Sequence, residues 1–541
     1  MTDAAPLVIT DFLFRAREMF GDKLIIDHVD GVETMRYDYR TYSDRVLRLA
    51  AALVARGVRP GDRVGTLAWN HHRHLELYLA IPLAGAVLHT INIRLEADEI
   101  AYIVDHADDT LVFADPSLEH LLSEARRRRP DMPVVSLDDG EYEDLIATNP
   151  PLTQPVPRRD DDLAALCYTS GTTGSPKGVG YRHKSLYLHT FAACLADGHA
   201  ISERDRVLLV VPMFHANAWG VPFAALMSGA DQVLPGPHPA PADIAAIIER
   251  HQVTYTGMVP TVAVDLVAHA IREHIDLTSL RALVLGGSTP STGLIRDIEE
   301  RLGVPAFQGW GMTEISPMAT FSRPPASVAD DDSAARADYI RKQGRLLPGL
   351  RWRLLADDGS DAPHDGVSRG EVLIRGPWVA TEYFGDPHPD RFVDGWLRTG
   401  DIGTIDSRGY LEIVDRAKDL IKSGGEWISS VALEEQLLAH PAVAEAAVVA
   451  MTHPRWQERP VAFVVGAGDA PSDIEALYAD LRERLPRWWI PDHIVVVDAL
   501  PRTSVGKLDK RTLRERVSAD PPLWEPTNGA AEPVPVAAAD S

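Results

Sequence analysis

Short apolar runs alternate with amphipathic stretches along most of the chain. An apolar run at residues 64–69 precedes a helical pattern over residues 71–86, and further runs cover residues 110–114, 207–211 and 282–285. Runs this short are typical of buried strands, and strands that alternate with helices predict largely parallel sheets. Because 541 residues are too many for a single core, we expect α/β layers in more than one domain.

The pattern changes near residue 340. From there to residue 415, short strand-like runs are separated by turns rich in Gly and Asp, which indicates a small antiparallel or barrel-like subdomain. Helical and strand patterns then mix in a compact α+β unit, and the last residues are rich in Pro, Ala and acids. We therefore expect domains over residues 1–415 and 416–515 and a disordered tail over residues 516–541.

The sequence pattern predicts a local structural role for three side chains in or next to these elements. Asn70 directly precedes a helical stretch and is predicted to be its N-cap. Asp401 precedes Ile402 and is predicted to close a turn into a strand. Cys167 lies within the apolar run 163–168 and is predicted to pack in the core.

A glycine-rich loop, Tyr168-Thr-Ser-Gly-Thr-Thr-Gly-Ser-Pro-Lys-Gly-Val179, follows that apolar run. Its backbone N–H groups and hydroxyls suit phosphate oxygens, with Lys177 as a point charge. The loop is not a Walker A motif, because Pro176 stands where the second glycine is required and Gly178 follows the lysine in place of Ser or Thr. The loop therefore predicts a phosphate site of another kind.

Charge and cysteine content restrict the partners and the compartment. The net charge of −24 disfavours nucleic acid and anionic membrane as partners. Two cysteines argue against a disulfide framework and favour a reducing, cytoplasmic location. Neither a signal peptide nor a transmembrane run is expected, because the first residues are acidic and no apolar run reaches 18 residues.

Further motifs follow the glycine-rich loop in order, and together they resemble the AMP-forming adenylate-forming superfamily. This superfamily contains acyl-CoA synthetases, nonribosomal-peptide adenylation domains and firefly-type luciferases. The resemblance covers residues 10–515 and looks closest to medium- and long-chain fatty acyl-CoA synthetases. The motifs are Gly309-Trp-Gly-Met-Thr-Glu314, Gly395-Trp-Leu-Arg-Thr-Gly-Asp401, Asp415-Arg-Ala-Lys-Asp419, Lys422-Ser-Gly-Gly-Glu-Trp427 and Pro501-Arg-Thr-Ser-Val-Gly-Lys507.

The resemblance implies both the fold and the reaction. The fold would be α/β, with a large N-terminal body of two αβ-layered sheet subdomains and a barrel-like subdomain, then a small mobile α+β domain that swivels at Lys418. The enzyme would use ATP and Mg²⁺ to convert a fatty or aryl-alkanoic acid to an acyl-adenylate, releasing pyrophosphate. Transfer to coenzyme A would then give acyl-CoA and AMP.

Site residues follow from the resemblance motif by motif. Thr169 and Glu314 would hold Mg²⁺, Trp310 would stack on adenine, and Asp401 with Arg416 would bind the ribose. Lys507, Glu314, Lys177 and His215 would be the catalytic residues. The full set implied for ATP and AMP is Thr169, Ser170, Gly171, Thr172, Thr173, Gly174, Lys177, Gly287, Ser288, Thr289, Gln308, Gly309, Trp310, Gly311, Met312, Thr313, Glu314, Asp401, Arg416 and Lys507.

The stretch Pro212-Met-Phe-His-Ala-Asn-Ala-Trp219 bears on the choice of acid. Amino-acid-activating relatives have an Asp at the position of His215 to bind the substrate ammonium, so an α-amino acid is not expected. The resemblance implies that His215, Trp219, Gly287 and Gly311 line the acyl site, and nearby aromatic side chains suit an alkyl or aryl acid.

The acceptor is the least constrained part of the prediction. In the family the small domain rotates, which withdraws Lys507 and brings in the segment expected to bind CoA: Lys422, Ser423, Gly424, Gly425, Glu426 and Trp427. The alternative is an adenylating enzyme of specialised metabolism that loads a carrier-protein thiol or a non-thiol nucleophile. A non-catalytic homologue is disfavoured, because the charged motif residues are retained. A homodimer is left open.

Overall fold

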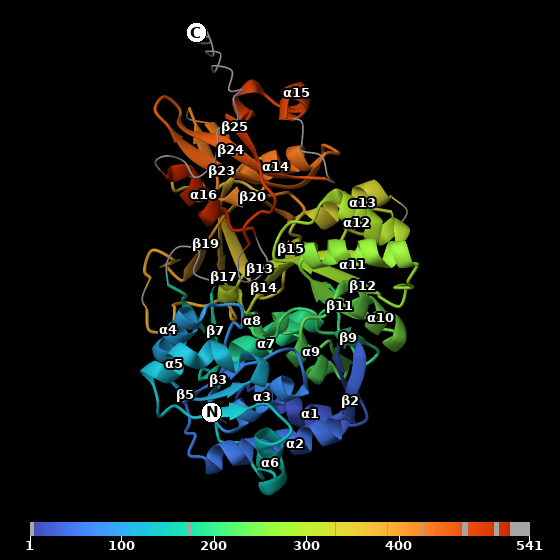
Figure 1. Cartoon of the computed structure of the whole chain (residues 1–541), viewed down its shortest axis with the longest axis vertical. Coiled ribbons are helices and arrows are strands. Elements are labelled where there is room, and N and C mark those ends of the chain that lie inside the picture. Colours follow the sequence, from blue (N-terminus) through green and yellow to red (C-terminus); the bar gives the residue numbers. More distant parts are fainter. Residues whose placement is uncertain are drawn as a thin grey trace. The chain divides into compact units, whose positions relative to one another are not determined.

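The computed structural model describes residues 5–169, 175–329, 332–386, 388–424, 426–467, 474–502 and 508–519. The chain divides into two compact units (Figure 1). Unit 1 comprises Met1–Arg353, Leu373–Arg398 and Ile405–Leu411, and unit 2 comprises Leu354–Val372, Thr399–Thr404 and Glu412–Ser541. Each unit is described below by itself.

A nine-stranded sheet is the larger of two sheets in unit 1. Its centre, from β1 to β13, is parallel, and its edges, β2 at one side and β14 with β15 at the other, are antiparallel. The order is β15 (Arg345–Leu346), β14 (Met318–Ser322), β13 (Ala306–Gly311), β12 (Ala282–Gly286), β11 (Tyr255–Met258), β9 (Arg206–Leu208), β10 (Asp231–Leu234), β1 (Leu24–Val29) and β2 (Val32–Asp38).

The second sheet of unit 1 has six strands and is parallel except for the β7–β8 hairpin. This hairpin carries the glycine-rich loop. The order is β6 (Val134–Ser136), β5 (Asp109–Ala114), β3 (Arg63–Leu67), β4 (Val87–Thr90), β7 (Leu163–Tyr168) and β8 (Gly178–Arg182).

Alternate residues of these strands enter different cores, because successive side chains of a strand point to opposite faces. In β9, Val207 belongs to a core that it shares with Val64 of β3, whereas Leu208 belongs to a core with the outer helices. The two sheets therefore share a middle layer of helices, and each has helices on its outer face. The middle layer is α2 (Tyr39–Ala55), α3 (His72–Leu83), α7 (His183–Cys194) and α9 (Val221–Ser228); outside lie α10 (Pro241–His251), α11 (Pro260–Glu273), α4 (Ala97–Ala107) and α5 (Ser123–Arg128).

The remaining helices described in unit 1 are shorter or peripheral. They are α1 (Asp11–Met19), α6 (Glu141–Thr148), α8 (Ala216–Trp219), α12 (Thr292–Arg296), α13 (Ser333–Arg341), η1 (Pro116–Leu122), η2 (Asp297–Arg301) and η3 (Thr313–Ile315).

The predicted N-cap of α3 is wrong by one residue. His71 is the N-cap, and its ring accepts a hydrogen bond from the backbone N–H of His74 at 3.3 Å. Asn70 is instead buried and makes long-range hydrogen bonds: its Nδ2 donates to the carbonyls of Leu209 and Val211 at 2.7 and 2.8 Å. Its side chain thereby ties the start of α3 to the chain beyond β9.

A small sheet of five strands occupies the region where the sequence predicts an antiparallel subdomain. Asp401 lies inside the ten-residue strand β19 and not at a turn, so that prediction was wrong. The strand continues through this position although Gly400, the residue directly before it, has a positive φ of 72°, which glycine tolerates. The sheet has the order β16 (Arg351–Leu355), β17 (Gly370–Arg375), β19 (Trp396–Ile405) and β18 (Phe392–Val393), and β20 (Leu411–Arg416) also pairs with β19.

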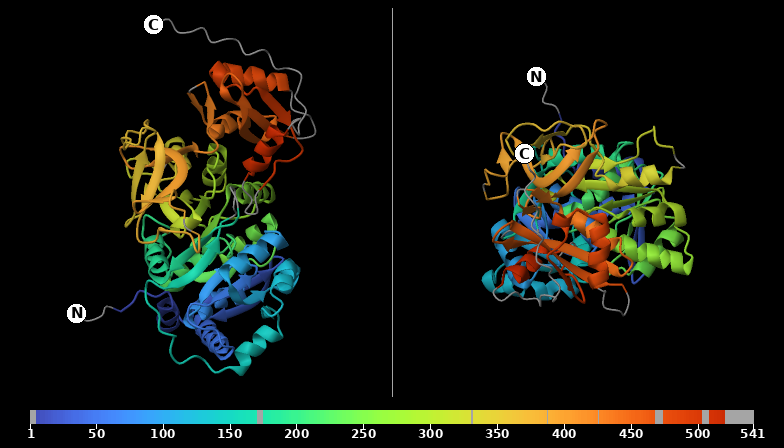
Figure 2. Two further views of the ribbon diagram at one scale, coloured as in Figure 1. Left: turned by 90° about the vertical axis from the view of Figure 1, so that its left-hand side faces the viewer. Right: turned by 90° about the horizontal axis from the view of Figure 1, so that it is seen from above.

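The C-terminal part of unit 2 is a sheet with helices on both faces (Figure 2). Helices α14 (Ser430–Leu438) and α15 (Ile474–Arg484) share one core with the sheet, and α16 (Lys510–Ser518) packs on the other face through Leu513 and Val517. A short turn, η4 (Arg487–Trp489), precedes the last strand. The sheet contains β22 (Glu426–Ile428), β21 (Ile421–Ser423), β24 (Gln457–Gly466), β23 (Val443–His453) and β25 (His493–Val496).

The predicted fold class is confirmed: layered α/β sheets, a small extra sheet and an α+β C-terminal part. The boundaries expected at residues 415/416 and 515/516 remain predictions. Among the helices in the described ranges, none has both the length and the apolar composition needed to cross a membrane.

Candidate active site

The β7–β8 hairpin holds both ends of the glycine-rich loop. The backbone N–H of Thr169 donates to the carbonyl of Lys177 at 3.0 Å, and the N–H of Lys177 lies 3.4 Å from Thr169 Oγ1. Directly beyond these contacts, Tyr168 pairs with Gly178 in the antiparallel register. Thr169 and Lys177, the described residues on either side of the loop, are therefore held opposite each other at the end of the hairpin.

Tyr383 connects two predicted site residues. Its hydroxyl donates to Glu314 Oε1 at 2.6 Å, and the ammonium nitrogen of Lys177 lies 5.2 Å from the centre of its ring. Burial, followed by the charge of Glu314, raises the pKa of Tyr383, so the phenol stays protonated and acts as the donor. One aromatic side chain thus orients a carboxylate and packs beside a cation at the base of the phosphate loop.

The motif around Glu314 is shaped by close backbone contacts. A Cβ on Gly311 would lie 1.8 Å from the carbonyl oxygen of Pro317, so this position requires glycine. Glu314 is only 5% exposed, and its own carbonyl accepts from the N–H of Ala380 at 2.8 Å. The preceding residue, Thr313, accepts at its carbonyl from the Tyr181 hydroxyl at 2.8 Å.

Other members of this motif differ in exposure. Gly309 and Trp310 lie near the end of β13 and are both half-buried, whereas Met312 begins the turn into η3. Gln308 is buried, and its amide faces the carbonyls of Ile340 and Arg341 at the end of α13. The side chain of Gln308 therefore contacts the end of α13, and its assignment to the nucleotide remains a prediction.

The predicted acyl-site segment contains an unusual backbone. Ala216, Asn217, Ala218 and Trp219 have φ values of 43°, 51°, 50° and 56°, so four residues with side chains follow one another in the left-handed region. Such a conformation costs about 1–2 kcal/mol per residue, so surrounding contacts must hold it. His215 and Trp219, at its two ends, are half-buried, while the three residues between them are buried.

Hydrogen bonds from two neighbouring elements hold this segment. Asn70 Oδ1 accepts from the N–H of Met213 at 2.8 Å, and Tyr78 donates its hydroxyl to the carbonyl of the same residue. Thr90 Oγ1 donates to the carbonyl of Phe214 at 3.2 Å. Because these partners come from the start and middle of α3 and the end of β4, the six-stranded sheet and its helices fix the position of His215.

Trp219 lies across the carboxyl ends of two parallel strands. A Cβ on Gly286 of β12 would approach its ring to 2.7 Å, and one on Gly257 of β11 to 3.3 Å. Both glycines therefore make room for the indole. Ligands of α/β sheets bind beyond the carboxyl ends of the strands, which makes this edge a candidate binding surface.

The segment after β12 lies at the same edge. Gly287 has a φ of 87°, and it is exposed together with Ser288. Thr289 accepts at Oγ1 from Gln343 Nε2 at 3.1 Å. Gln343 was not expected at the site; its contact with Thr289 fixes the end of the exposed segment.

In unit 2, Asp401 and Arg416 form an ion pair. Arg416 Nε lies 3.0 Å from Asp401 Oδ1, with the carboxylate buried and the guanidinium half-exposed. The N–H of Asp401 donates to Thr399 Oγ1 at 3.1 Å, and Ala417 donates to the carbonyl of Gly400 at 2.9 Å. A buried carboxylate held beside an exposed cation suits a polar ligand with hydroxyl groups.

The predicted CoA segment is a β-hairpin. Lys422 pairs with Trp427 across it, with Nζ 5.1 Å from the ring centre, and Ser423 pairs with Glu426. Gly424 has a φ of 64°, and a Cβ there would lie 2.9 Å from Trp456 Cε3. The hairpin thus packs against Trp456, a contact that the sequence did not predict. The predicted pivot Lys418 is exposed, in the turn between β20 and β21.

The segment that contains Lys507 begins and ends at an antiparallel bridge between Arg502 and Leu508. Beyond the bridge, Lys510 Nζ lies 2.7 Å from Glu434 Oε1 and donates to Ser430 Oγ at 2.7 Å. Ser430 in turn donates from its backbone and its hydroxyl to Asp415, the residue before Arg416. A continuous set of contacts therefore joins the start of α16 to the Asp401–Arg416 pair.

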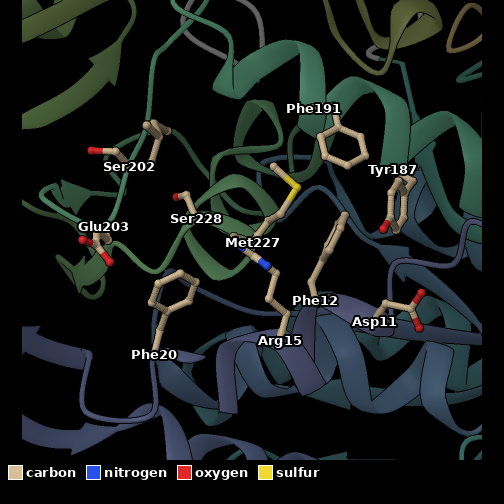
Figure 3. Close-up of a pocket in the computed structure, with 11 residues that line it drawn as sticks. Asp11, Phe12, Arg15, Phe20, Tyr187, Phe191, Ser202, Glu203, Met227 and Ser228 are labelled. Carbon is tan, nitrogen blue, oxygen red and sulfur yellow. The ribbon is translucent and has the colours of Figure 1, made fainter. Parts of the chain in front are cut away.

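Unit 1 also contains a cavity of about 580 Å³, which is lined by residues other than the predicted site residues (Figure 3). Figure 3 shows Phe12, Tyr187, Phe191 and Met227 gathered around it, from α1, α7 and α9, with Arg15 beside Met227. No residue expected to bind the acid or the nucleotide lines this cavity.

Seven predicted site residues lie outside the described residues. They are Ser170, Gly171, Thr172, Thr173, Gly174, Gly425 and Lys507. Their assignments rest on the sequence.

The fold and these residues together define an enzyme of the adenylate-forming class. The AMP-binding enzyme family matches residues 13–384, and the AMP-binding enzyme C-terminal domain matches residues 432–507. A long-chain-fatty-acid–CoA ligase of Thermus thermophilus is 44% identical over 94% of this chain and 95% of its own. A 3-methylmercaptopropionyl-CoA ligase of Ruegeria lacuscaerulensis is 40% identical over 94% of this chain and 97% of its own.

Solved structures of adenylate-forming enzymes have a similar fold. The structure of an anthranilate CoA ligase in complex with anthranoyl-AMP has a TM-score of 0.84 at 26% identity, and the match covers 94% of this chain and 98% of that one. The chain belongs to the AMP-binding enzyme family. The predicted resemblance is therefore confirmed.

Proposed function

We propose that this protein activates a fatty or aryl-alkanoic acid with ATP and transfers the acyl group to coenzyme A. The class of reaction follows from the family: the chain is an AMP-forming acid–thiol ligase. The observation that best supports the proposed residues is the arrangement of Lys177, Tyr383 and Glu314 at the base of the glycine-rich loop. It combines a cation with an oriented carboxylate beside the place expected for phosphate.

In the first half-reaction the acid's carboxylate oxygen attacks the α-phosphorus of ATP, and pyrophosphate leaves. Two anions must approach each other, so donors and cations must be fixed in advance. Lys177 and the N–H groups of the glycine-rich loop stabilise the leaving phosphates, and Lys507 neutralises charge between the carboxylate and the α-phosphate. Asp401 and Arg416 bind the ribose hydroxyls, and Trp310 stacks on the adenine.

The donor atoms of Glu314 and Thr169 fit Mg²⁺. A carboxylate and a hydroxyl are hard oxygen ligands, which is what this ion prefers. Glu314 is also oriented by its hydrogen bond from Tyr383, as second-shell partners orient metal ligands. When bound, Mg²⁺ would neutralise phosphate charge, and Tyr383 would keep Glu314 turned toward it.

The acid-binding assignment rests on His215 and Trp219. Both are half-buried at the ends of a strained, well-anchored turn, and Trp219 lies over the ends of β11 and β12. Trp219 supplies an apolar surface for an alkyl or aryl chain. No carboxylate stands at position 215 to pair with an ammonium group, so free α-amino acids are poor substrates.

Coenzyme A is the proposed acceptor, and the hairpin from Lys422 to Trp427 is its proposed binding segment. Its thiolate attacks the carbonyl carbon of the acyl-adenylate, and AMP leaves with the phosphate oxygen. Gly424 is exposed and packs against Trp456 on one side, and a pantetheine arm would pass along its other, open side. A carrier-protein thiol would use the same segment and is the alternative acceptor.

A panel of acids tests the proposal. ATP–pyrophosphate exchange is measured with alkanoates of increasing chain length, with aryl-alkanoates and with the matching α-amino acids. We expect exchange with the first two groups and little with the third. His215→Ala should change the order of preference among acids and leave the KM for ATP nearly constant. Preference for a free amino acid, or an altered KM for ATP alone, would contradict the acid-binding assignment.

A further inference from the structure

Two buried histidines and a glutamate meet at one side of unit 1. One ligand atom each from His28, Glu33 and His251 lies within 4.8 Å of the other two. Both histidines are buried, at 1% and 5% exposure, and Glu33 is partly exposed. None of the three belongs to the residues proposed for the nucleotide, the acid or CoA.

The fold brings these residues together from two elements. His28 and Glu33 are directly opposite each other in the antiparallel pair of β1 and β2, so their side chains share one face of the sheet. His251 is the last residue of α10, which packs on that face. The cluster thus joins the first hairpin of the chain to a helix more than 200 positions later.

The distances suit a small transition-metal ion. His28 Nε2 and His251 Nε2 are 2.9 Å apart, and His251 Nε2 is 3.9 Å from Glu33 Oε2. Tetrahedral zinc with bonds of roughly 2.0–2.1 Å requires ligand atoms roughly 3.3 Å apart. These two spacings lie on either side of that value, and the third, between His28 and Glu33, is at most 4.8 Å, so side-chain rotations would have to draw Glu33 inward to complete the geometry.

Two of the three proposed ligands, His28 and Glu33, are each oriented by a further hydrogen-bond partner. His28 Nδ1 lies 3.3 Å from the carbonyl oxygen of Leu234, which can only accept, so this nitrogen carries the proton and Nε2 presents a lone pair. Arg36 donates to both carboxylate oxygens of Glu33, at 2.7 and 2.8 Å. Ligating histidines and carboxylates in metal sites are held in this way. Arg36 also adds positive charge nearby, which the Glu33 carboxylate offsets.

A divalent metal binds the neutral form of an imidazole, through a ring nitrogen that carries no proton. Two neutral rings facing each other through Nε2 need one shared proton, and His251 supplies it in the absence of a cation. A metal would replace that proton, with the His251 proton moving to Nδ1.

We propose that His28, Glu33 and His251 form a binding site for a divalent transition metal such as Zn²⁺. Nitrogen and carboxylate ligands are typical of zinc, and the exposed side of Glu33 leaves access for a water as the fourth ligand. The site is structural: it fastens the β1–β2 hairpin to the end of α10 and does not take part in acyl transfer.

The test uses the full-length protein, freed of metal by a chelator and without ATP, which would compete for the ion. Zn²⁺ is titrated in competition with a chromophoric chelator, and Co²⁺ is used to record the absorption bands of a tetrahedral site. We expect one tight Zn²⁺ per chain and a higher Tm with Zn²⁺ bound. His251→Gln should weaken binding more than roughly 100-fold, because loss of even an outer-shell partner costs about 10- to 100-fold.

Two further variants make the result decisive. Glu33→Gln changes a partly exposed residue, so it should fold even if His251→Gln does not, and it should also weaken Zn²⁺ binding and remove the Co²⁺ bands. His120→Gln, which changes an exposed histidine outside the cluster, should leave both unchanged. Anomalous scattering at the zinc edge should peak between the three ligands. Absence of tight Zn²⁺ binding, binding that Glu33→Gln does not alter, or a peak elsewhere would overturn the proposal.

Discussion

Tyr383→Phe removes one hydroxyl and keeps the aromatic ring. The hydroxyl donates to Glu314 Oε1 at 2.6 Å, while the ring faces Lys177 at 5.2 Å. The substitution therefore separates the two contacts of Tyr383: the hydrogen bond to the carboxylate is lost, and the contact with the cation is kept. Adenylate formation should fall, because Glu314 is no longer turned toward the phosphates and Mg²⁺.

The size of the effect follows from the hydrogen bond. A bond to a charged group contributes about 1.5–3 kcal/mol, and each 1.36 kcal/mol of barrier is a factor of about ten in rate. We therefore expect the rate of ATP–pyrophosphate exchange to drop roughly 10- to 100-fold. The concentration of Mg²⁺ that gives half the maximal rate should rise, whereas thioester formation from supplied acyl-AMP should change little.

A second tyrosine provides the control. Tyr410 also donates its hydroxyl, to the carbonyl of Arg323 at 2.6 Å, but Arg323 has no proposed role in the reaction. Tyr410→Phe should lower the free energy of unfolding by about 1 kcal/mol and leave the exchange rate unchanged. A folded Tyr383→Phe protein with the wild-type exchange rate and Mg²⁺ dependence would refute the role of Tyr383.

Three further outcomes are expected. Lys507→Ala should slow adenylate formation roughly 100-fold or more and spare thioester formation from acyl-AMP, which single-turnover assays of the two steps would reveal; equal losses in both would argue against a role limited to the first step. Gly424→Ala should slow thioester formation from acyl-AMP and spare adenylate formation. The reason is that a φ of 64° and the contact with Trp456 strain the new side chain by about 1–2 kcal/mol. Lys510→Met should lower the free energy of unfolding by about 3–5 kcal/mol near pH 8. Burial already raises the pKa values of Asp415 and Glu434, and a group whose pKa is raised by folding stabilises the fold as the pH falls. Urea unfolding should therefore show a smaller loss of stability in this variant near pH 5. A loss of stability that does not depend on pH would count against the buried cluster.

Local pattern was enough to locate the strands for which the sequence predicted a range. The apolar run at residues 163–168 is β7 as predicted, and the run at 282–285 differs from β12 by one residue. The predicted packing role of Cys167 is confirmed: the thiol is buried, and burial raises its pKa to about 11. These features depend on short stretches of sequence and on whether a side chain is apolar, which the sequence records directly.

The error at Asn70 and the omission of Tyr383 both involve contacts between distant parts of the chain. Asn70 is of a residue type common at N-caps, but its side-chain amide donates to backbone carbonyls near residue 210 instead of capping the helix. Tyr383 stands in no glycine-rich motif, and its importance follows only from its distance to Glu314. The left-handed turn before Gly220 contains two alanines, which nothing local favours there, and a long-range hydrogen bond from Met213 to Asn70 holds the chain just before it.

The central claim is that this chain forms an acyl-adenylate and then passes the acyl group to coenzyme A. The most direct measurement is mass spectrometry of all products from ATP, Mg²⁺ and an acid from the exchange panel, with coenzyme A, with a carrier protein, and with neither. We expect AMP, pyrophosphate and acyl-CoA in the first reaction, and enzyme-bound acyl-AMP with an equal amount of pyrophosphate when no acceptor is present. ADP and phosphate in place of AMP and pyrophosphate, or an acyl product with the carrier protein but none with coenzyme A, would contradict it.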